Sequence, residues 1–135
     1  AAPRPARVMA PSVVAGGLLL ALITGFAAGR VGAAAADPEK GKALFEQCAA
    51  CHALDETKTD GPTLKGVFGR KAGSLEDFRY SVAMKRTDIV WDVTTMDRFM
   101  ADPQAYIRGN RMAFAGMTDK AERDDLIAYL QENAK

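Results

Sequence analysis

The residues with the clearest chemistry are Cys48, Cys51 and His52, in the stretch Cys48-Ala49-Ala50-Cys51-His52. Two thiols three positions apart can add to the two vinyl groups of a haem, and a histidine directly after them can ligate its iron. Zinc would need two further ligands, but these are the only cysteines and the only histidine of the chain. A redox dithiol would lie beside a βαβ pattern, which the sequence lacks, and would leave His52 unexplained. The motif therefore predicts one covalent haem c.

A helix must deliver the first cysteine to this cofactor. Asp37 is a suitable N-cap, Pro38 suits the first helical position, and Glu39 favours the positive end of the helix dipole. Leu44 and Cys48 then recur at helical spacing. The sequence predicts a helix that begins after Asp37 and ends at the haem motif.

Two further cap signals predict short helices in the second half of the domain. Thr94, followed three residues later by Asp97, resembles a capping box and would open a helix over Thr95–Ala101. Asp102 directly before Pro103 repeats the arrangement of a cap followed by a proline. We therefore expect a second helix start at Pro103.

The last helix is predicted from Thr118 to about Asn133, with Leu126, Ile127 and Leu130 on its apolar side. No alternating pattern of useful length indicates a strand. The predicted fold class is all-α, with one haem domain over residues 37–135.

The charge distribution separates the first thirty-six residues from the rest. They contain three arginines and no acidic residue, whereas residues 37–135 hold fifteen basic and seventeen acidic side chains. The domain is therefore slightly acidic despite the chain's formal net charge of +1. An acidic domain argues against nucleic acid as a partner.

The stretch between Arg7 and Arg30 holds twenty-two residues without a charge. As a helix it would span roughly 33 Å, enough to cross a bilayer. We expect residues 1–30 to be a leader and membrane anchor, with residues 8–29 in the membrane and residues 31–36 as a short linker. The excess of arginine before the span predicts a cytoplasmic N-terminus and an external domain. The alternative is a cleaved signal peptide, for which Ala33 to Ala36 offer a small-residue site.

The order and spacing of several motifs resemble class I cytochrome c. These motifs are Gly41-Lys42-Ala43-Leu44-Phe45, CAACH, Gly61-Pro62-Thr63-Leu64, Phe68-Gly69-Arg70-Lys71-Ala72-Gly73, Trp91, Tyr106-Ile107, Met112-Ala113-Phe114-Ala115-Gly116 and Asp125-Leu126-Ile127-Ala128-Tyr129-Leu130. The likeness covers nearly all of residues 37–135 and none of the first thirty-six. Within the family, the chain looks similar to the membrane-anchored cytochromes c of α-proteobacteria. The resemblance implies a class I cytochrome c haem domain preceded by one N-terminal transmembrane helix.

The resemblance also implies a ligand set. Met112 matches the family's second axial ligand opposite His52, and a thioether in that position raises the reduction potential. Pro62 matches the proline whose carbonyl accepts the proton of the ligating imidazole. Of the remaining methionines, Met117 matches an aliphatic core position. Three others have spacings typical of packing: Met84, Met96 and Met100.

Three further residues match positions that serve the haem propionates. Tyr80 and Trp91 match hydrogen-bond donors to a propionate, and Arg70 matches the arginine that helps to neutralise it. Two positions depart from the mitochondrial pattern in ways that bear on Met112. Phe99 stands where a tyrosine hydroxyl approaches the ligating sulfur, and Asn110 replaces a threonine before the ligand. Two further departures are Arg108, at a position usually held by proline, and Met84, in place of an asparagine near the haem.

With both axial positions filled by protein, the resemblance implies a one-electron carrier and not an enzyme. Its donor would be a quinol-oxidising cytochrome bc-type complex, and its acceptor a haem–copper terminal oxidase or a photosynthetic reaction centre. It would lie in the bacterial inner membrane as a single-pass protein, with the haem domain on the periplasmic side. The alternatives are a fixed subunit of a respiratory or photosynthetic supercomplex, a soluble periplasmic carrier, and a haem peroxidase or gas sensor.

Docking in this family uses basic residues around the exposed haem edge. We define a predicted basic rim of seven residues: Lys42, Lys65, Lys71, Lys85, Arg86, Arg108 and Arg111. A tether raises the effective concentration of the domain at its partners, so that weak electrostatic attraction is sufficient for docking.

Overall fold

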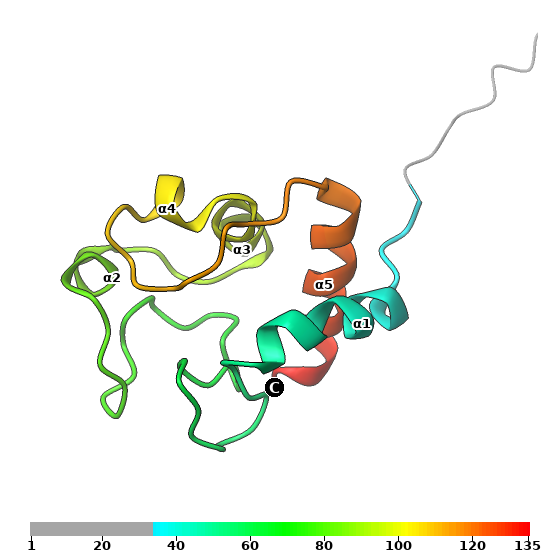
Figure 1. Cartoon of the computed structure of the whole chain (residues 1–135). Coiled ribbons are helices and arrows are strands. Elements are labelled where there is room, and N and C mark those ends of the chain that lie inside the picture. The colour runs from blue at the N-terminus through cyan, green and yellow to red at the C-terminus, as the bar shows by residue number, and fades with distance from the viewer. Residues whose placement is uncertain (1–33) are drawn as a thin grey trace, which may run out of the picture. The chain divides into compact units, whose positions relative to one another are not determined.

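Helices form the regular structure of the domain. The computed structural model describes residues 34–135, which form α1 (Pro38–Ala49), α2 (Val82–Arg86), α3 (Val93–Ala101), α4 (Pro103–Tyr106) and α5 (Lys120–Asn133) (Figure 1). The prediction of an all-α domain is confirmed for this range. The predicted anchor at residues 8–29 lies outside it. No helix within residues 34–135 is both long and apolar enough to cross a membrane.

The first helix begins as the sequence predicts. The Asp37 side chain accepts hydrogen bonds from the backbone N–H groups of Glu39 and Lys40, and Pro38 occupies the first turn. These contacts satisfy N–H groups that have no partner inside the helix. The helix then runs to Ala49, so that Cys48 lies in its last turn.

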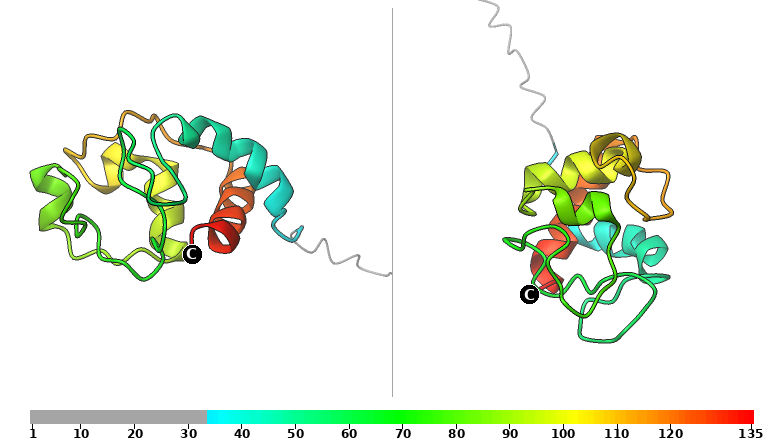
Figure 2. Two further views of the ribbon diagram at one scale, coloured as in Figure 1. Left: turned by 90° about the horizontal axis from the view of Figure 1, so that it is seen from below. Right: turned by 90° about the vertical axis from the view of Figure 1, so that its left-hand side faces the viewer.

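Helices α1 and α5 lie against each other in all three ribbon views (Figures 1 and 2). Their contact is close because residue 41 is a glycine: a Cβ atom there would overlap the carbonyl oxygen of Asp125. Beside this contact the rings of Phe45 and Tyr129 pack with their centroids 5.6 Å apart. The sequence motif around Gly41 therefore fixes the crossing of the first and last helices.

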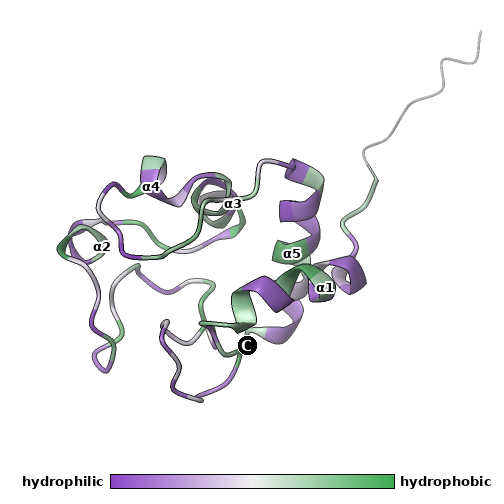
Figure 3. Ribbon diagram, viewed as in Figure 1, coloured by the Kyte–Doolittle hydropathy of each residue, from purple (hydrophilic) through white to green (hydrophobic). Residues whose placement is uncertain are grey.

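Helix α5 begins two residues later than predicted. Asp119 is its N-cap and accepts from the N–H groups of Ala121 and Glu122. The predicted apolar side is confirmed, since Leu126 and Ile127 are at most 2% exposed. The hydrophobic part of the helix lies where it meets α1, and its first turns are hydrophilic (Figure 3).

The start of α3 differs from the prediction. Its N-cap is Asp92, whose carboxylate accepts from the Thr95 N–H at 2.7 Å, while the Thr95 hydroxyl accepts from the Asp92 N–H at 2.8 Å. The predicted box of Thr94 and Asp97 was wrong because a carboxylate two residues earlier accepts from the orphan N–H groups instead. Asp97 instead forms an ion pair with Arg123 of α5.

The two shortest helices, α2 and α4, each begin after a residue whose side chain caps the first turn. Asp102 caps α4 by accepting from the Ala105 N–H, as the Asp102-Pro103 pair predicted. Helix α2 was not predicted, because five residues are too short to show a helical period. Its cap is Ser81, whose hydroxyl accepts from the Met84 N–H at 3.1 Å.

A short antiparallel contact joins the loop after α1 to the segment before α3. Lys71 and Val90 form an isolated bridge, and the Trp91 N–H donates to the Arg70 carbonyl at 2.9 Å. No strand forms among residues 34–135. The contact brings Arg70 and Trp91 together, although they are twenty-one positions apart in the sequence.

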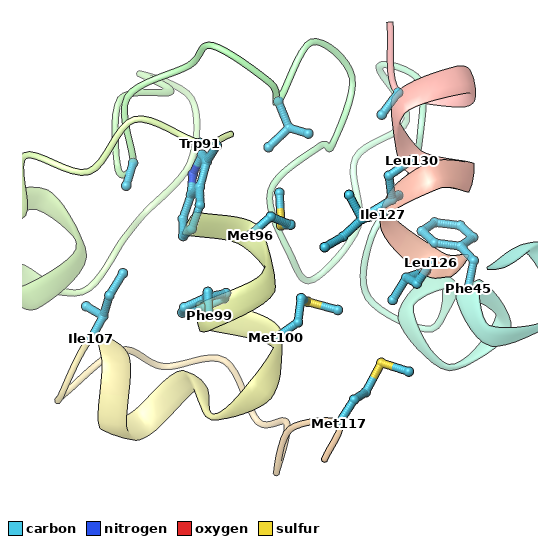
Figure 4. Packing of buried hydrophobic residues seen from close by; sticks show 13 residues of the cluster. Phe45, Trp91, Met96, Phe99, Met100, Ile107, Met117, Leu126, Ile127 and Leu130 are labelled. Atoms are coloured by element: carbon cyan, nitrogen blue, oxygen red, sulfur yellow. The ribbon is translucent and has the colours of Figure 1, made fainter. Parts of the chain in front are cut away.

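The hydrophobic core lies between α3 and α5 (Figure 4). Met96, Phe99 and Met100 enter it from α3, and Leu126 and Ile127 from α5. The three residues from α3 also line the cavity described next.

Candidate cofactor site

One cavity of about 640 Å³ brings together every site residue predicted from the sequence. They are Cys48, Cys51, His52, Pro62, Arg70, Tyr80, Trp91 and Met112. They come from α1, the long loop after it, the segment before α3 and the loop between α4 and α5. Most of the other lining residues are apolar, including Leu64, Val67 and Phe99.

The end of α1 carries the two thiols and the histidine into this cavity. The N–H groups of Cys51 and His52 both bond to the Cys48 carbonyl, at 3.0 and 2.9 Å, which adds a tight turn after the helix. Cys48 and Cys51 form no disulfide bond with each other. Burial raises the pKa of the Cys48 thiol to about 11, so that it is protonated at neutral pH.

The His52 ring is held by a direct hydrogen bond. Its Nδ1 lies 2.7 Å from the Pro62 carbonyl oxygen. Because a carbonyl can only accept, Nδ1 donates this hydrogen bond, and in the neutral imidazole the lone pair is then on Nε2. This is the arrangement that orients a metal-ligating histidine and increases its basicity.

Gly61 contributes to the same arrangement, a role that the sequence analysis missed. A Cβ atom at this position would lie 2.7 Å from both the His52 Cε1 atom and the Cys51 carbonyl oxygen. The Gly61 N–H also donates to that carbonyl at 2.7 Å. The Gly-Pro pair was the available signal, because Gly allows the close approach and Pro supplies the acceptor.

Met112 lies in the loop between α4 and α5 and is half-buried. Its N–H donates to the Asn110 side-chain oxygen, and its carbonyl accepts from the Phe114 N–H, both at 2.9 Å. Phe99 is 5% exposed and lines the cavity, as expected for the residue in place of a tyrosine. Its ring offers no hydrogen-bond donor to a methionine sulfur.

The three residues predicted to serve propionates border the cavity with polar groups. Arg70 is half-buried, and its guanidinium donates to the carbonyls of Lys65 and Thr63 at 2.8 and 2.7 Å. Burial lowers the pKa of Arg70 and raises the pKa of the Tyr80 hydroxyl. Arginine still remains charged at neutral pH, and the neutral Tyr80 hydroxyl can donate. Trp91 packs on Phe99 with ring centroids 5.1 Å apart.

This donor set fits a covalently attached haem. It offers two thiols, an imidazole Nε2 lone pair, a thioether and apolar walls, together with a cation and two neutral donors for anionic groups. Within residues 34–135, no three His, Cys, Asp or Glu side chains gather as a metal ion site of their own. The fold and the cavity thus define a small helical domain of the kind that binds one haem through protein side chains.

The predicted basic rim is only partly free of acidic partners. Lys65 pairs with Glu56 at 2.8 Å and Lys71 with Asp88 at 3.0 Å. The other five have no ion-pair partner among the described residues: Lys42, Lys85, Arg86, Arg108 and Arg111. Of all seven, only Arg111 lines the cavity.

Two arginines with structural contacts were missed from the sequence, one lining the cavity and one away from it. Arg79 lines the cavity, and its carbonyl accepts from the Arg111 guanidinium. Arg123 of α5 is 8% exposed and donates to Asp97 and to the Met117 carbonyl, at 2.8 and 2.7 Å. No local motif distinguishes either residue, because their partners are far away in the sequence or are backbone atoms.

Comparisons with known proteins agree with this site. The family model for cytochrome c matches residues 38–134. Cytochrome c 2.1 of Caenorhabditis elegans is 45% identical over 104 residues, covering 75% of this chain and 94% of that protein. Cytochrome c2 of Rhodoplanes tepidamans is 44% identical over 98 residues, covering 71% and 92% respectively. The solved structure of cytochrome cH from Methylobacterium extorquens superposes with a TM-score of 0.68 at 39% identity, covering 71% of this chain and 98% of that one.

The chain therefore belongs to the class I cytochrome c family. This membership confirms the predictions of one covalent haem c and of an electron carrier rather than an enzyme.

Proposed function

We propose that this cytochrome c is a membrane-tethered carrier that takes single electrons from a quinol-oxidising cytochrome bc-type complex. It passes them to a haem–copper terminal oxidase or a photosynthetic reaction centre. Residues 8–29 anchor it in the bacterial inner membrane, and the haem domain works on the periplasmic side. The uncharged stretch between Arg7 and Arg30 supports the anchor. The likeness to proteins named cytochrome c2 and cytochrome cH supports the role in bacterial electron transfer.

In this proposal Cys48 and Cys51 hold the haem covalently, and His52 and Met112 ligate its iron. When bound, the haem supplies an iron that gains and loses one electron. The Pro62 carbonyl keeps the His52 proton on Nδ1, so that Nε2 stays a strong donor. The apolar walls exclude water from the ligands.

Three residues serve the anionic edge of the cofactor in the same proposal. Arg70, Tyr80 and Trp91 direct polar groups at the propionates, which would otherwise be costly to bury. Arg70 also holds the loop before it through the carbonyls of Thr63 and Lys65.

The observation that carries the proposal is the meeting of His52 and Met112 in one cavity that also contains both thiols. With His52 and Met112 both ligating the iron, no position would remain open for oxygen or peroxide. The test is carbon monoxide binding to the reduced holoprotein. We expect no binding in the wild type and tight binding in Met112→Ala, which opens one axial position. Met117→Ala is the control, because Met117 is buried in the core and does not line the cavity. Tight binding by the wild type would favour a peroxidase or sensor instead.

The anchor has its own test. Isolated membranes are washed with high salt and then with alkaline carbonate, covalent haem is stained on a gel, and the N-terminus of the stained band is read. Haem that stays with the membrane, in a chain that retains residues 8–29, supports the tether. Release with an N-terminus near Asp37 would contradict it and indicate a soluble periplasmic carrier.

A fixed subunit of a larger complex is the second candidate, and the start of the domain favours it. The Asp37 N–H donates to the Asp125 carboxylate of α5 at 2.6 Å, so the domain is tied down from its first helical cap onward. Only residues 31–36 then remain as a linker. Such a linker, fully extended, reaches about 20 Å, which keeps the domain near the membrane surface. Copurification with its partner complex through mild detergent would favour the fixed subunit, whereas migration alone would favour the mobile carrier.

We propose that docking uses the unpaired members of the basic rim. Electron transfer to a purified oxidase should then slow as salt is added, because salt screens exposed charges. Lys85→Ala should slow it more than Lys71→Ala, since the Lys71 ammonium already pairs with Asp88 and is less available to a partner. Equal effects of the two variants, or a rate that is flat with salt, would count against the rim.

A further inference from the structure

Asn110 is a buried polar residue whose side chain uses all of its main hydrogen-bonding groups inside the protein. It is 6% exposed. Its amide nitrogen donates to the carbonyls of Pro103 and Ile107 at 2.7 and 2.9 Å. Its side-chain oxygen accepts from the Met112 N–H at 2.9 Å. One side chain therefore connects helix α4 to the backbone of Met112.

The backbone around Asn110 is fixed as well. The Asn110 N–H donates to the Ile107 carbonyl at 3.0 Å, across a turn in which Gly109 has a φ of 88°. The Asn110 carbonyl accepts from the side-chain amide of Gln104 at 3.1 Å. The residue is therefore held to α4 and the turn after it through both its side chain and its backbone.

The far end of the same loop is held independently. The Met117 N–H donates to the Met100 carbonyl of α3 at 2.8 Å. A Cβ atom on Gly116 would overlap the Ala101 carbonyl oxygen, so only glycine allows the loop to lie this close to α3. Met112 thus lies in a loop whose two ends are fixed, and Asn110 holds the end nearer to Met112.

The Met112 side chain lacks the support that a tyrosine at position 99 could give. Phe99 lines the cavity but has no hydroxyl to bond a methionine sulfur. Control over the sulfur must then come from the backbone that carries it. Since the Met112 N–H bonds to Asn110, we propose that Asn110 is the positioning residue that holds Met112 in place as an iron ligand. This inference rests on the proposed ligation by Met112.

The test follows the methionine-to-iron charge-transfer band of the oxidised holoprotein as the pH is raised. At high pH, hydroxide becomes concentrated enough to compete with the methionine for the iron. Asn110→Ala should lower the pH at which half of the band is lost by about one unit, because it weakens methionine ligation about tenfold. Gln104→Ala, at an exposed position, should lower it by roughly half a unit.

Asn133→Ala is the matched control. Its side-chain amide also donates to a backbone carbonyl, that of Tyr129 at 2.9 Å, but it is exposed on α5. This variant should leave the band's pH midpoint unchanged. Urea unfolding, followed by Trp91 fluorescence, is measured in parallel on all three variants.

Lowered pH midpoints in Asn110→Ala and Gln104→Ala, with no change in Asn133→Ala, support the proposal. An Asn110→Ala protein that unfolds at lower urea but keeps the wild-type pH midpoint overturns it, because Asn110 would then be structural only. If Asn110→Ala fails to fold, an unchanged midpoint in Gln104→Ala overturns it. A wild-type protein without the band would instead refute ligation by Met112, which is a failure of the proposed function.

Discussion

The two sides of the cavity are held in different ways. On the histidine side (residues 48–62), His52 follows α1 closely, and its ring is fixed directly by the Pro62 carbonyl, ten positions away. On the methionine side (residues 110–117), Met112 lies in a loop and is held through its backbone N–H and carbonyl. Hydrogen bonding therefore fixes the side chain of His52 directly, whereas it fixes only the backbone of Met112.

The partners of the two sides also differ in their distance along the chain. Apart from the contact of Asn110 with α4, the methionine side depends on α3 through the Met100 carbonyl and on α5 through Arg123. The histidine side depends mostly on residues of its own segment. We therefore expect changes in the helical frame to affect Met112 first and His52 last.

The largest expected effect is that of Arg123→Leu, which acts on the methionine side. It leaves the Asp97 carboxylate without its partner and removes the donor from the Met117 and Thr118 carbonyls. Loss of one partner of a mostly buried pair should lower the free energy of unfolding by about 3 kcal/mol, measured by urea denaturation. The pH midpoint of the charge-transfer band should also fall, while the haem remains bound through its histidine.

The control for this variant is Lys71→Ala, which removes a surface ion pair with side chains 51% and 95% exposed. It should change the free energy of unfolding by less than about 1 kcal/mol. A band midpoint that stays unchanged in Arg123→Leu would contradict the dependence of the methionine side on the helical frame.

A smaller effect is expected from Gly61→Ala, which acts on the histidine side. Its new Cβ atom would meet the His52 ring and the Cys51 carbonyl, so either the loop or the ring must move. Overpacking of this kind costs about 1–3 kcal/mol in the free energy of unfolding. Because the clash bears on the ring of the ligating histidine, the spin state of the iron should change as well, which electron paramagnetic resonance would detect.

Gly66→Ala separates this clash from backbone strain. Gly66 has a φ of 64°, but nothing lies within 4 Å of where its Cβ would be. It should therefore reduce stability without changing the iron signal. Identical iron signals in Gly61→Ala and the wild type would show that the close approach of Gly61 does not control His52.

The smallest effect is expected at the start of α3, which carries Met100 toward the methionine side. The Thr95 backbone N–H and hydroxyl hold the pKa of Asp92 below its ordinary value of 3.8. A lowered pKa in the folded state means that the cap stabilises the protein above pH 3.8 and that this contribution is lost as the pH falls through the lower folded value. Asp92→Ala should therefore unfold at lower urea than the wild type near neutral pH, and the difference should shrink in acid. A difference that grows in acid would exclude this cap as its cause.

The sequence was most informative where the determinants are local. The haem motif, the Asp37 cap and the Asp102-Pro103 start each depend on residues within a few positions, and the structure has both helix starts as predicted. The apolar face of α5 was also predictable, because its spacing repeats along one helix. Arg70, Tyr80 and Trp91 were predicted as site residues from the family resemblance, because their spacing in the sequence alone does not indicate a shared site.

The sequence was least informative where partners lie far apart. The cap of α3 was misplaced because Thr94 and Asp92 are both plausible caps, and only the folded backbone selects between them. From the sequence, Arg123 could not be told from an ordinary exposed charge on a helix. Its partner Asp97 lies on α3 and becomes its neighbour only in the folded protein. Asn110 was read as a substitution near the ligand, but the carbonyls that it binds become its neighbours only after α4 has formed.

The most direct test of the ligand set is nuclear magnetic resonance of the reduced holoprotein with ¹³C-labelled methionine methyl groups. The chain has six methionines, and four of them line the cavity: Met84, Met96, Met100 and Met112. If Met112 ligates the iron, one methyl signal is shifted strongly upfield by the haem ring, is lost in Met112→Leu and is retained in Met100→Leu. A shifted signal that survives in Met112→Leu, or its absence from the wild type, would contradict it.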